Sequence, residues 1–193
     1  MDTGRQILTY ALLVLVFGVA VPYWKGLDFL DPALLCAYAC MGMVFAGPAA
    51  SQAFEKRPAS TVEALRWIGV AVAFGEAISI AMLGCGLVTL YATRSKMLTF
   101  PPDLGGLILP EALGLALSLA IAAMAAWTAM RFSAGSARTA LRLVFMALLG
   151  AFFLRGRWLP QVAGQGAAIA FAAAVLFLGM LMRCLRQGGL RQA

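Results

Sequence analysis

The sequence predicts an all-α, multi-pass membrane protein with about six transmembrane helices, in which residues 1–193 form a single transmembrane domain. Composition supports this fold class, because 63% of the residues are hydrophobic, only 12% are charged and the mean hydropathy is +0.90. A soluble chain of 193 residues cannot bury so much apolar surface, since its outside would be as apolar as its core. The apolar run from Gln6 to Arg183 is broken only by short charged clusters, so the surroundings expected for most of the chain are a lipid bilayer.

Six segments are predicted as spans, because a helix needs about 20 apolar residues to cross a bilayer. They cover residues 7–24, 32–50, 64–92, 108–131, 138–154 and 161–183. The first could be a signal peptide cleaved after Ala20, but the run from Pro22 to Lys25 is typical of a membrane interface and favours a retained helix. The fifth segment is short, and its Arg155–Trp158 end is expected to reach the interface by snorkelling.

The basic residues predict the orientation of these spans. One side of the membrane would hold Arg5, Lys56, Arg57, Arg66, Arg131, Arg138, Arg142, Arg183, Arg186 and Arg191, and the other Lys25, Arg94, Lys96, Arg155 and Arg157. Since cytoplasmic loops carry the excess of Lys and Arg, both termini are expected in the cytoplasm and the protein in the inner membrane of a bacterium. The formal charge of +7 then fits contact with lipid headgroups, and no nucleic-acid partner is expected.

The residue types that most catalytic and metal sites need are missing from the sequence. It contains no histidine, no phosphate-binding loop ending in Lys-Ser/Thr, and no pair of carboxylates placed for acid–base chemistry. Cys36 and Cys40 share a helix face and, like Cys85 and Cys184, are interpreted as packing residues. We therefore expect no enzymatic activity, no cofactor and no metal ion.

Glu76 is the one acidic residue well inside a predicted span. Such a carboxyl is expected to be protonated, paired or in contact with a wet cavity, because an unpaired charge in hydrocarbon costs at least a few kcal/mol. Two interpretations have equal weight: a proton or substrate site, or a carboxyl hydrogen-bonded to a neighbouring helix. Glu111, beside Pro110, is interpreted as stabilising the start of the fourth span rather than contacting a substrate.

Small residues recur every four positions in two spans. The fourth span contains Gly114, Ser118, Ala122 and Ala126, and the sixth contains Gly164, Ala168 and Ala172 together with Gly166, Ala170 and Ala174. Such stripes let helix backbones approach closely in lipid. They predict helix contacts either within one chain or between the two copies of a homodimer.

Two polar connections separate the spans. Residues 51–66 form an elbow, in which Pro58 ends the second helix and Ser60 with Glu63 predicts a capping box for a helix that starts near Thr61. The elbow is interpreted either as a docking segment or as an ordinary solvated turn. Residues 93–110 are rich in Pro and Gly and predict a loop that connects two spans or covers an opening.

The elbow and the six spans together resemble the ABC-2-type transporter permease family. The resemblance lies in Phe54-Glu55-Lys56-Arg57, followed by Ser60-Thr61-Val62-Glu63-Ala64-Leu65. It implies a permease subunit driven by a separate cytoplasmic ATPase, with Phe54, Glu55, Lys56 and Arg57 as docking contacts, Glu76 lining the path and two chains rocking together. The chain departs from the family in having only about six residues before its first span, where family members carry an amphipathic helix.

Two other functions remain open beside a transport subunit of this kind. One is a helical scaffold or assembly subunit of a larger membrane complex, in which Glu76→Ala would be tolerated. The other is a small proton-coupled carrier, in which Glu76→Ala would abolish transport. The elbow narrowly favours the permease.

Overall fold

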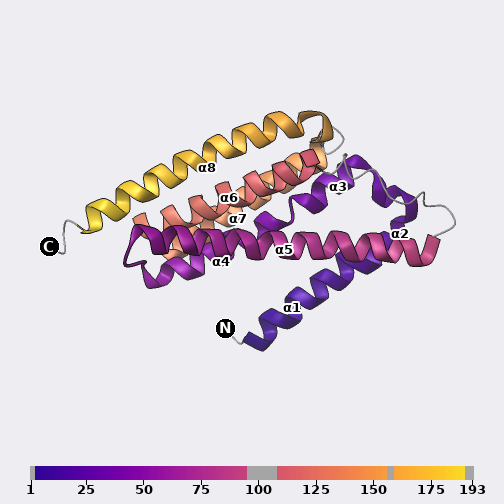
Figure 1. Cartoon of the computed structure of the whole chain (residues 1–193), viewed down its shortest axis with the longest axis horizontal. Helices are drawn as coiled ribbons and strands as arrows, with labels where there is room; N and C mark the ends of the chain where they lie inside the picture. Colours follow the sequence, from indigo (N-terminus) through magenta and orange to yellow (C-terminus); the bar gives the residue numbers. More distant parts are fainter. Residues whose placement is uncertain (1–2, 95–107, 156–158, 190–193) are drawn as a thin grey trace.

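The molecule is a bundle of long helices that lie alongside one another (Figure 1). The computed structural model describes residues 3–94, 108–155 and 159–189, with side-chain surroundings from residue 8 onward except at residues 134, 149–162, 188 and 189. Throughout this part of the chain every element is helical, so the all-α prediction is confirmed. Lys96, Arg157, Trp158, Arg191 and residues 95–107, where most of the predicted loop falls, lie outside the described residues.

The helices follow one another with short connections. In chain order they are α1 (Thr3–Leu15), the π-helical segment η1 (Val16–Ala20), α2 (Val21–Lys25), the 3₁₀ segment η2 (Gly26–Leu30), α3 (Pro32–Ala39), α4 (Gly42–Ala53), the 3₁₀ segment η3 (Phe54–Lys56), α5 (Thr61–Arg94), α6 (Ile108–Arg131), α7 (Ala134–Arg155) and α8 (Leu159–Gly189).

Five segments of the described chain are long and apolar enough to cross a membrane. They are Leu8–Leu30, Pro32–Lys56, Thr61–Arg94, Ile108–Arg131 and Ala163–Gln187, which match the first, second, third, fourth and sixth predicted spans. The second extends six residues beyond its predicted end at residue 50, because the chain stays helical through the first part of the elbow. An integral membrane protein is therefore supported.

The predicted fifth span, residues 138–154, coincides with α7, which is a continuous helix of 22 residues. It packs against α6 and α4 as a member of the bundle. Side chains beyond residue 148 of α7 lie outside the described surroundings. The helix is thus present, whereas the count of six spans is not confirmed.

A tight turn separates the first two spans. Gly26, at φ 59°, ends α2 with its N–H donating to the Pro22 carbonyl, a backbone conformation that a residue without Cβ adopts easily. Asp31 then starts α3 by accepting a hydrogen bond from the Ala33 N–H at 2.7 Å, with Pro32 in the first helical position. These local signals divide the chain into two antiparallel spans with a tight turn between them.

The core lies where α4, α5 and α6 meet. α6 is the central helix and contacts α3, α4, α5, α7 and α8. Its alanines Ala122, Ala125 and Ala126 are fully buried, and they pack in one cluster with Ile68 of α5 and Leu141 of α7. Small side chains on α6 let its neighbours approach closely, which provides the dispersion contacts that hold helices together in lipid.

The elbow ends one helix and starts the next as predicted. The Ser60 hydroxyl accepts from the Glu63 N–H at 3.1 Å, and the Glu63 carboxylate accepts from the Ala59 N–H at 2.7 Å. Two N–H groups that the helix itself leaves unpaired are thereby satisfied. The prediction that this helix begins near Thr61 is confirmed.

Candidate functional site

Glu76 lies on α5 with its carboxyl directed at α6. The Ser118 hydroxyl of α6 donates a hydrogen bond to Glu76 Oε1 at 2.5 Å. Ser118 is fully buried, whereas Glu76 is half-buried. The carboxyl therefore has a hydrogen-bond partner inside the bundle, and part of the Glu76 residue is not covered by the protein.

Three glycines bring the helix backbones close together around this carboxyl. A Cβ placed on Gly42 would collide with Glu76 Oε1 and would lie 3.0 Å from Ser118 Oγ. A Cβ on Gly75 would collide with the Gly42 carbonyl oxygen, and one on Gly114 would lie 2.7 Å from the carbonyl carbon of Ala39. At Gly75 and Gly114 the obstacle is main chain, so only glycine fits at these two positions, and the carboxyl lies where α5 and α6 approach the second span closely.

The second span tightens into a 3₁₀-like turn beside the carboxyl, between α3 and α4. The N–H of Met41 donates to the Tyr38 carbonyl at 3.0 Å, and the N–H of Met43 donates to the Cys40 carbonyl at 3.3 Å, so both bonds span three residues instead of four. The Ser79 hydroxyl of α5 donates to the same Tyr38 carbonyl at 2.6 Å. This carbonyl therefore accepts from a backbone N–H and from a side-chain hydroxyl, and a hydroxyl that bonds to a helix carbonyl is a known cause of bending.

Tyr38 connects this turn to the first span. Its hydroxyl donates to the Phe17 carbonyl in the π-helical segment η1, and its ring packs edge-on against buried Phe29 at 4.8 Å between centroids. The Thr89 hydroxyl of α5 contacts the next carbonyl of η1, that of Gly18, at 3.3 Å. The irregular segments of the first two spans thus share polar contacts through Tyr38 and α5.

A second acidic residue lies two helical turns from Ser118 on the same face of α6. This is Glu111, which belongs to the first turn of α6 and is half-buried. Its position in the first turn agrees with the prediction that it stabilises the helix start. In the described part of the chain no group of three His, Cys, Asp or Glu residues lies close enough to hold a metal ion. Cys36 and Cys40 are buried free thiols near the tightened turn.

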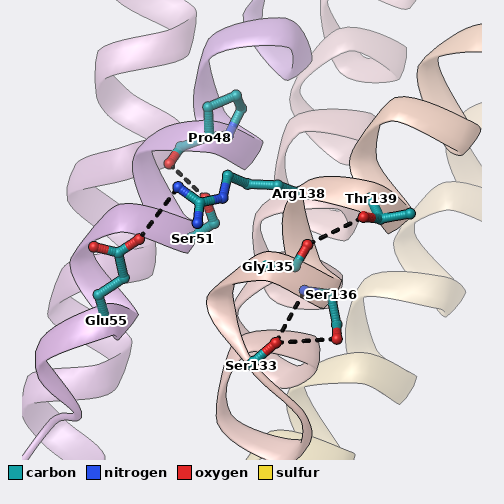
Figure 2. A network of polar contacts seen from close by, with 8 residues as sticks. All are labelled: Pro48, Ser51, Glu55, Ser133, Gly135, Ser136, Arg138 and Thr139. Atoms are coloured by element: carbon teal, nitrogen blue, oxygen red, sulfur yellow. Dashed lines mark hydrogen bonds and ion pairs between the residues drawn. The ribbon is translucent and has the colours of Figure 1, made fainter. Parts of the chain in front are cut away.

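The four residues predicted to dock an ATPase have different surroundings, and Figure 2 shows one of them, Glu55. Phe54 is 1% exposed and stacks edge-on against Trp67 at 5.5 Å, so in this conformation it belongs to the core. Glu55 forms an exposed ion pair with Arg138 of α7, with 3.7 Å between Oε1 and Nη1. Lys56 and Arg57 are exposed, which leaves Glu55, Lys56 and Arg57 as the accessible part of this segment.

The small-residue stripes separate into inward and outward faces. Gly114, Ser118 and Ala122 of α6 are buried in the bundle. On α8, Gly164, Ala168 and Ala172 are exposed, whereas Ala170 and Ala174 of the parallel stripe are buried. The stripe on α6 therefore packs within the chain, and the exposed stripe on α8 is left to lipid or to another chain.

Sequence reasoning found Glu76 but assigned Ser118 only to helix packing. The hydroxyl has both roles, since its place in a small-residue stripe is what brings it next to the carboxyl. Tyr38 and Gly42 were not singled out, because their contacts depend on the tightened turn after Ala39, and the proline inside α4, Pro48, lies several residues beyond that turn. Compared with protein families, curated proteins and solved structures, the chain shows no significant match.

Proposed function

We propose that this protein is the membrane subunit of a transport system and that Glu76 is the group that takes up and releases a proton during transport. One observation supports this proposal most strongly. Glu76 is hydrogen-bonded to Ser118 directly beside the point where the second span departs from regular helix geometry. The proton-coupled carrier, left open by the sequence, thereby becomes the first candidate.

The chemistry of an intramembrane carboxyl supports the same proposal. A charged carboxylate in the centre of a membrane costs roughly 3 kcal/mol on insertion scales, so an acid is expected there only with a partner or with a role. Glu76 has its partner in Ser118 and is half-buried rather than fully enclosed by the protein. Transporters place such groups at irregular segments of their spans, where a helix is able to bend.

A change of charge on Glu76 would act on the contacts around it. The carboxyl touches the position of Gly42, the first residue of α4, so a shift of the carboxyl presses on the junction between α3 and α4. The Ser79 and Tyr38 hydrogen bonds tie that junction to α5 and to the first span. Movement of one proton would thus be coupled to the relative positions of the first three spans.

The test is a pH jump on proteoliposomes adsorbed to a solid-supported membrane, which records charge movement without knowledge of the substrate. The wild-type protein is expected to give a transient current that Glu76→Gln removes. The amide of Gln still accepts the Ser118 hydrogen bond, so the fold is retained. Glu63→Gln, in the exposed elbow, is the matched control and keeps the current.

The scaffold alternative makes the opposite prediction. If the carboxyl only joins two helices, the wild-type protein would give no current. If the wild-type protein and Glu76→Gln give currents of the same size, Glu76 is not the group that exchanges the proton. Circular dichroism and thermal stability in detergent show whether each variant is folded before the current is interpreted.

A second candidate function is an ABC-2-like permease driven by a separate ATPase. The exposed charges of Glu55, Lys56 and Arg57 at the end of the bundle favour it, since they form an accessible polar segment between two spans. In this proposal the elbow end faces the cytoplasm of a bacterial cell, in keeping with its basic residues, and α7 supplies the sixth span. A homodimer would provide the second half of the translocation path.

Affinity purification in mild detergent tests this second candidate. A stoichiometric ATPase in the eluate, lost on charge reversal of Lys56 and Arg57, would establish the permease. An eluate free of ATPase would exclude it and would leave the proton-coupled carrier. Co-purification with a large complex devoid of ATPase would instead identify a structural subunit.

A further inference from the structure

Positive charge collects at the elbow end of the bundle, where α4 joins α5 and α6 joins α7. The described basic residues of this end are Lys56, Arg57, Arg66, Arg131, Arg138, Arg142, Arg183 and Arg186, and its described carboxylates are Glu55 and Glu63. Glu63 accepts a hydrogen bond in the start of α5, and Glu55 pairs with one arginine only. Most of these cations therefore have no ion-pair partner among the residues whose surroundings are described.

Two of these arginines lie on one exposed face of α7. Arg138 and Arg142 are four residues apart, which places them one above the other on a helix, and both are exposed. Arg138 reaches toward Glu55 of the elbow (Figure 2), but the pair is 3.7 Å long and each side chain remains about half exposed, at 61% and 47%. This long, hydrated contact leaves most of the guanidinium free to bind another anion.

Arg142 has no ion-pair partner among the residues whose surroundings are described. It lies eight residues into α7, about 12 Å along the helix axis at the standard rise. Met146, four residues after Arg142 on the same face of α7, is 68% exposed, and Leu143, next to Arg142 in the chain, is 67% exposed. A cation next to exposed apolar side chains, at the flank of a bundle that spans a membrane, is the arrangement found at the boundary between lipid headgroups and acyl chains.

We propose that Arg138 and Arg142 bind the phosphate of an anionic phospholipid, and that Leu143 and Met146 contact its acyl chains. A guanidinium presents a planar fork of donors that fits a phosphate with two parallel hydrogen bonds. The two guanidinium groups, one helical turn apart, would bind one headgroup from two sides. Basic residues between or beside spanning helices select anionic lipids in this way.

Charge complementarity identifies the occupant as a lipid rather than a protein segment. The only described carboxylate near the two arginines is Glu55, which is itself accessible and competes for Arg138. The face carries apolar side chains beyond the arginines, which an acidic soluble peptide would leave uncovered, whereas a phospholipid covers both parts at once. The proposal does not depend on the transport function of Glu76.

The experiment compares lipid binding by the full chain and two charge-matched variants. Protein in nanodiscs or detergent is titrated with phosphatidylglycerol or phosphatidylcholine and analysed by native mass spectrometry. The double variant R138Q/R142Q removes both forks. The control R66Q/R186Q lowers the net charge equally at exposed positions of the same end.

The wild-type protein is expected to retain phosphatidylglycerol over phosphatidylcholine, and R138Q/R142Q to bind phosphatidylglycerol about 30-fold more weakly, from roughly 1 kcal/mol for each basic residue. The control is expected to stay within a few-fold of the wild type. Equal losses in both double variants would show a general charge effect and would overturn the proposal. So would a wild-type protein that does not distinguish the two lipids. R138K/R142K, which keeps the charge and the fold but loses the forks, is expected to bind with intermediate strength.

Discussion

Replacement of Gly114 by Ala tests the close packing around Glu76. A Cβ on Gly114 would lie 2.7 Å from the carbonyl carbon of Ala39, and the obstacle is the main chain of α3, which has no rotamer that moves it away. We therefore take the upper end of the usual cost of overpacking, about 3 kcal/mol. Ala is about 1 kcal/mol better than Gly in a helix interior, so the expected net loss of stability is about 2 kcal/mol.

Gly69→Ala and Gly84→Ala in α5 are the matched controls. A Cβ at either position would have no neighbour within 4 Å, so only the helix preference acts and the bundle is expected to gain up to about 1 kcal/mol. The measurement is the unfolding free energy of each variant in mixed micelles titrated with dodecyl sulfate, followed by circular dichroism. A difference of about 3 kcal/mol between Gly114→Ala and the controls is expected. Equal stabilities would show that α3 and α6 do not approach as closely as described here.

Three further predictions concern single polar contacts. Tyr38→Phe removes the hydroxyl that donates to the Phe17 carbonyl. It is expected to lower the unfolding free energy by about 1 kcal/mol and to speed amide hydrogen exchange in residues 16–20. The control Tyr23→Phe, at an exposed tyrosine, should change neither quantity. Ser60→Ala removes the cap of α5 and should lower the unfolding free energy by about 1 kcal/mol, whereas Ser60→Asp should keep it. Glu55→Gln breaks an exposed ion pair and should change the unfolding free energy by less than about 1 kcal/mol, with a still smaller effect in high salt; a larger loss would mean that the Glu55–Arg138 pair holds the elbow in place.

Most of the fold could be predicted from two kinds of signal in the sequence, namely hydropathy and helix capping. The helix boundaries at Thr61 and Arg131 follow from local chemistry, namely a capping box at one and a charged residue that ends an apolar run at the other. The tightened turn after Ala39 and the π-helical segment at Val16 were not predicted. The tightened turn depends on contacts with α5 that are distant in sequence. The π-helical segment has a signal in the sequence that was overlooked, because Pro22, which follows it in the same helical run, has no N–H to donate to the Gly18 carbonyl.

The candidate site was predicted in part. An acidic residue in an apolar run is visible in any hydropathy reading, so Glu76 was found. Its surroundings were not, because the partner Ser118 comes from α6 and Gly42 from α4, and only the register of three packed helices brings them together. Phe54 illustrates the opposite difficulty: its neighbours in the chain are charged and exposed, yet the 3₁₀ turn of the elbow directs its ring into the core.

The proposed transport function requires that Glu76 changes its protonation state within the folded bundle. Infrared difference spectroscopy of the protein in lipid, recorded between acidic and alkaline buffer, measures this through the C=O stretch of a protonated carboxyl. We expect a carboxyl band in the wild-type protein that is missing in Glu76→Gln and shifted in Ser118→Ala, because the Ser118 hydroxyl contacts the same oxygen. A wild-type spectrum without a band that Glu76→Gln removes would contradict it, and would leave Glu76 as a polar contact between two helices.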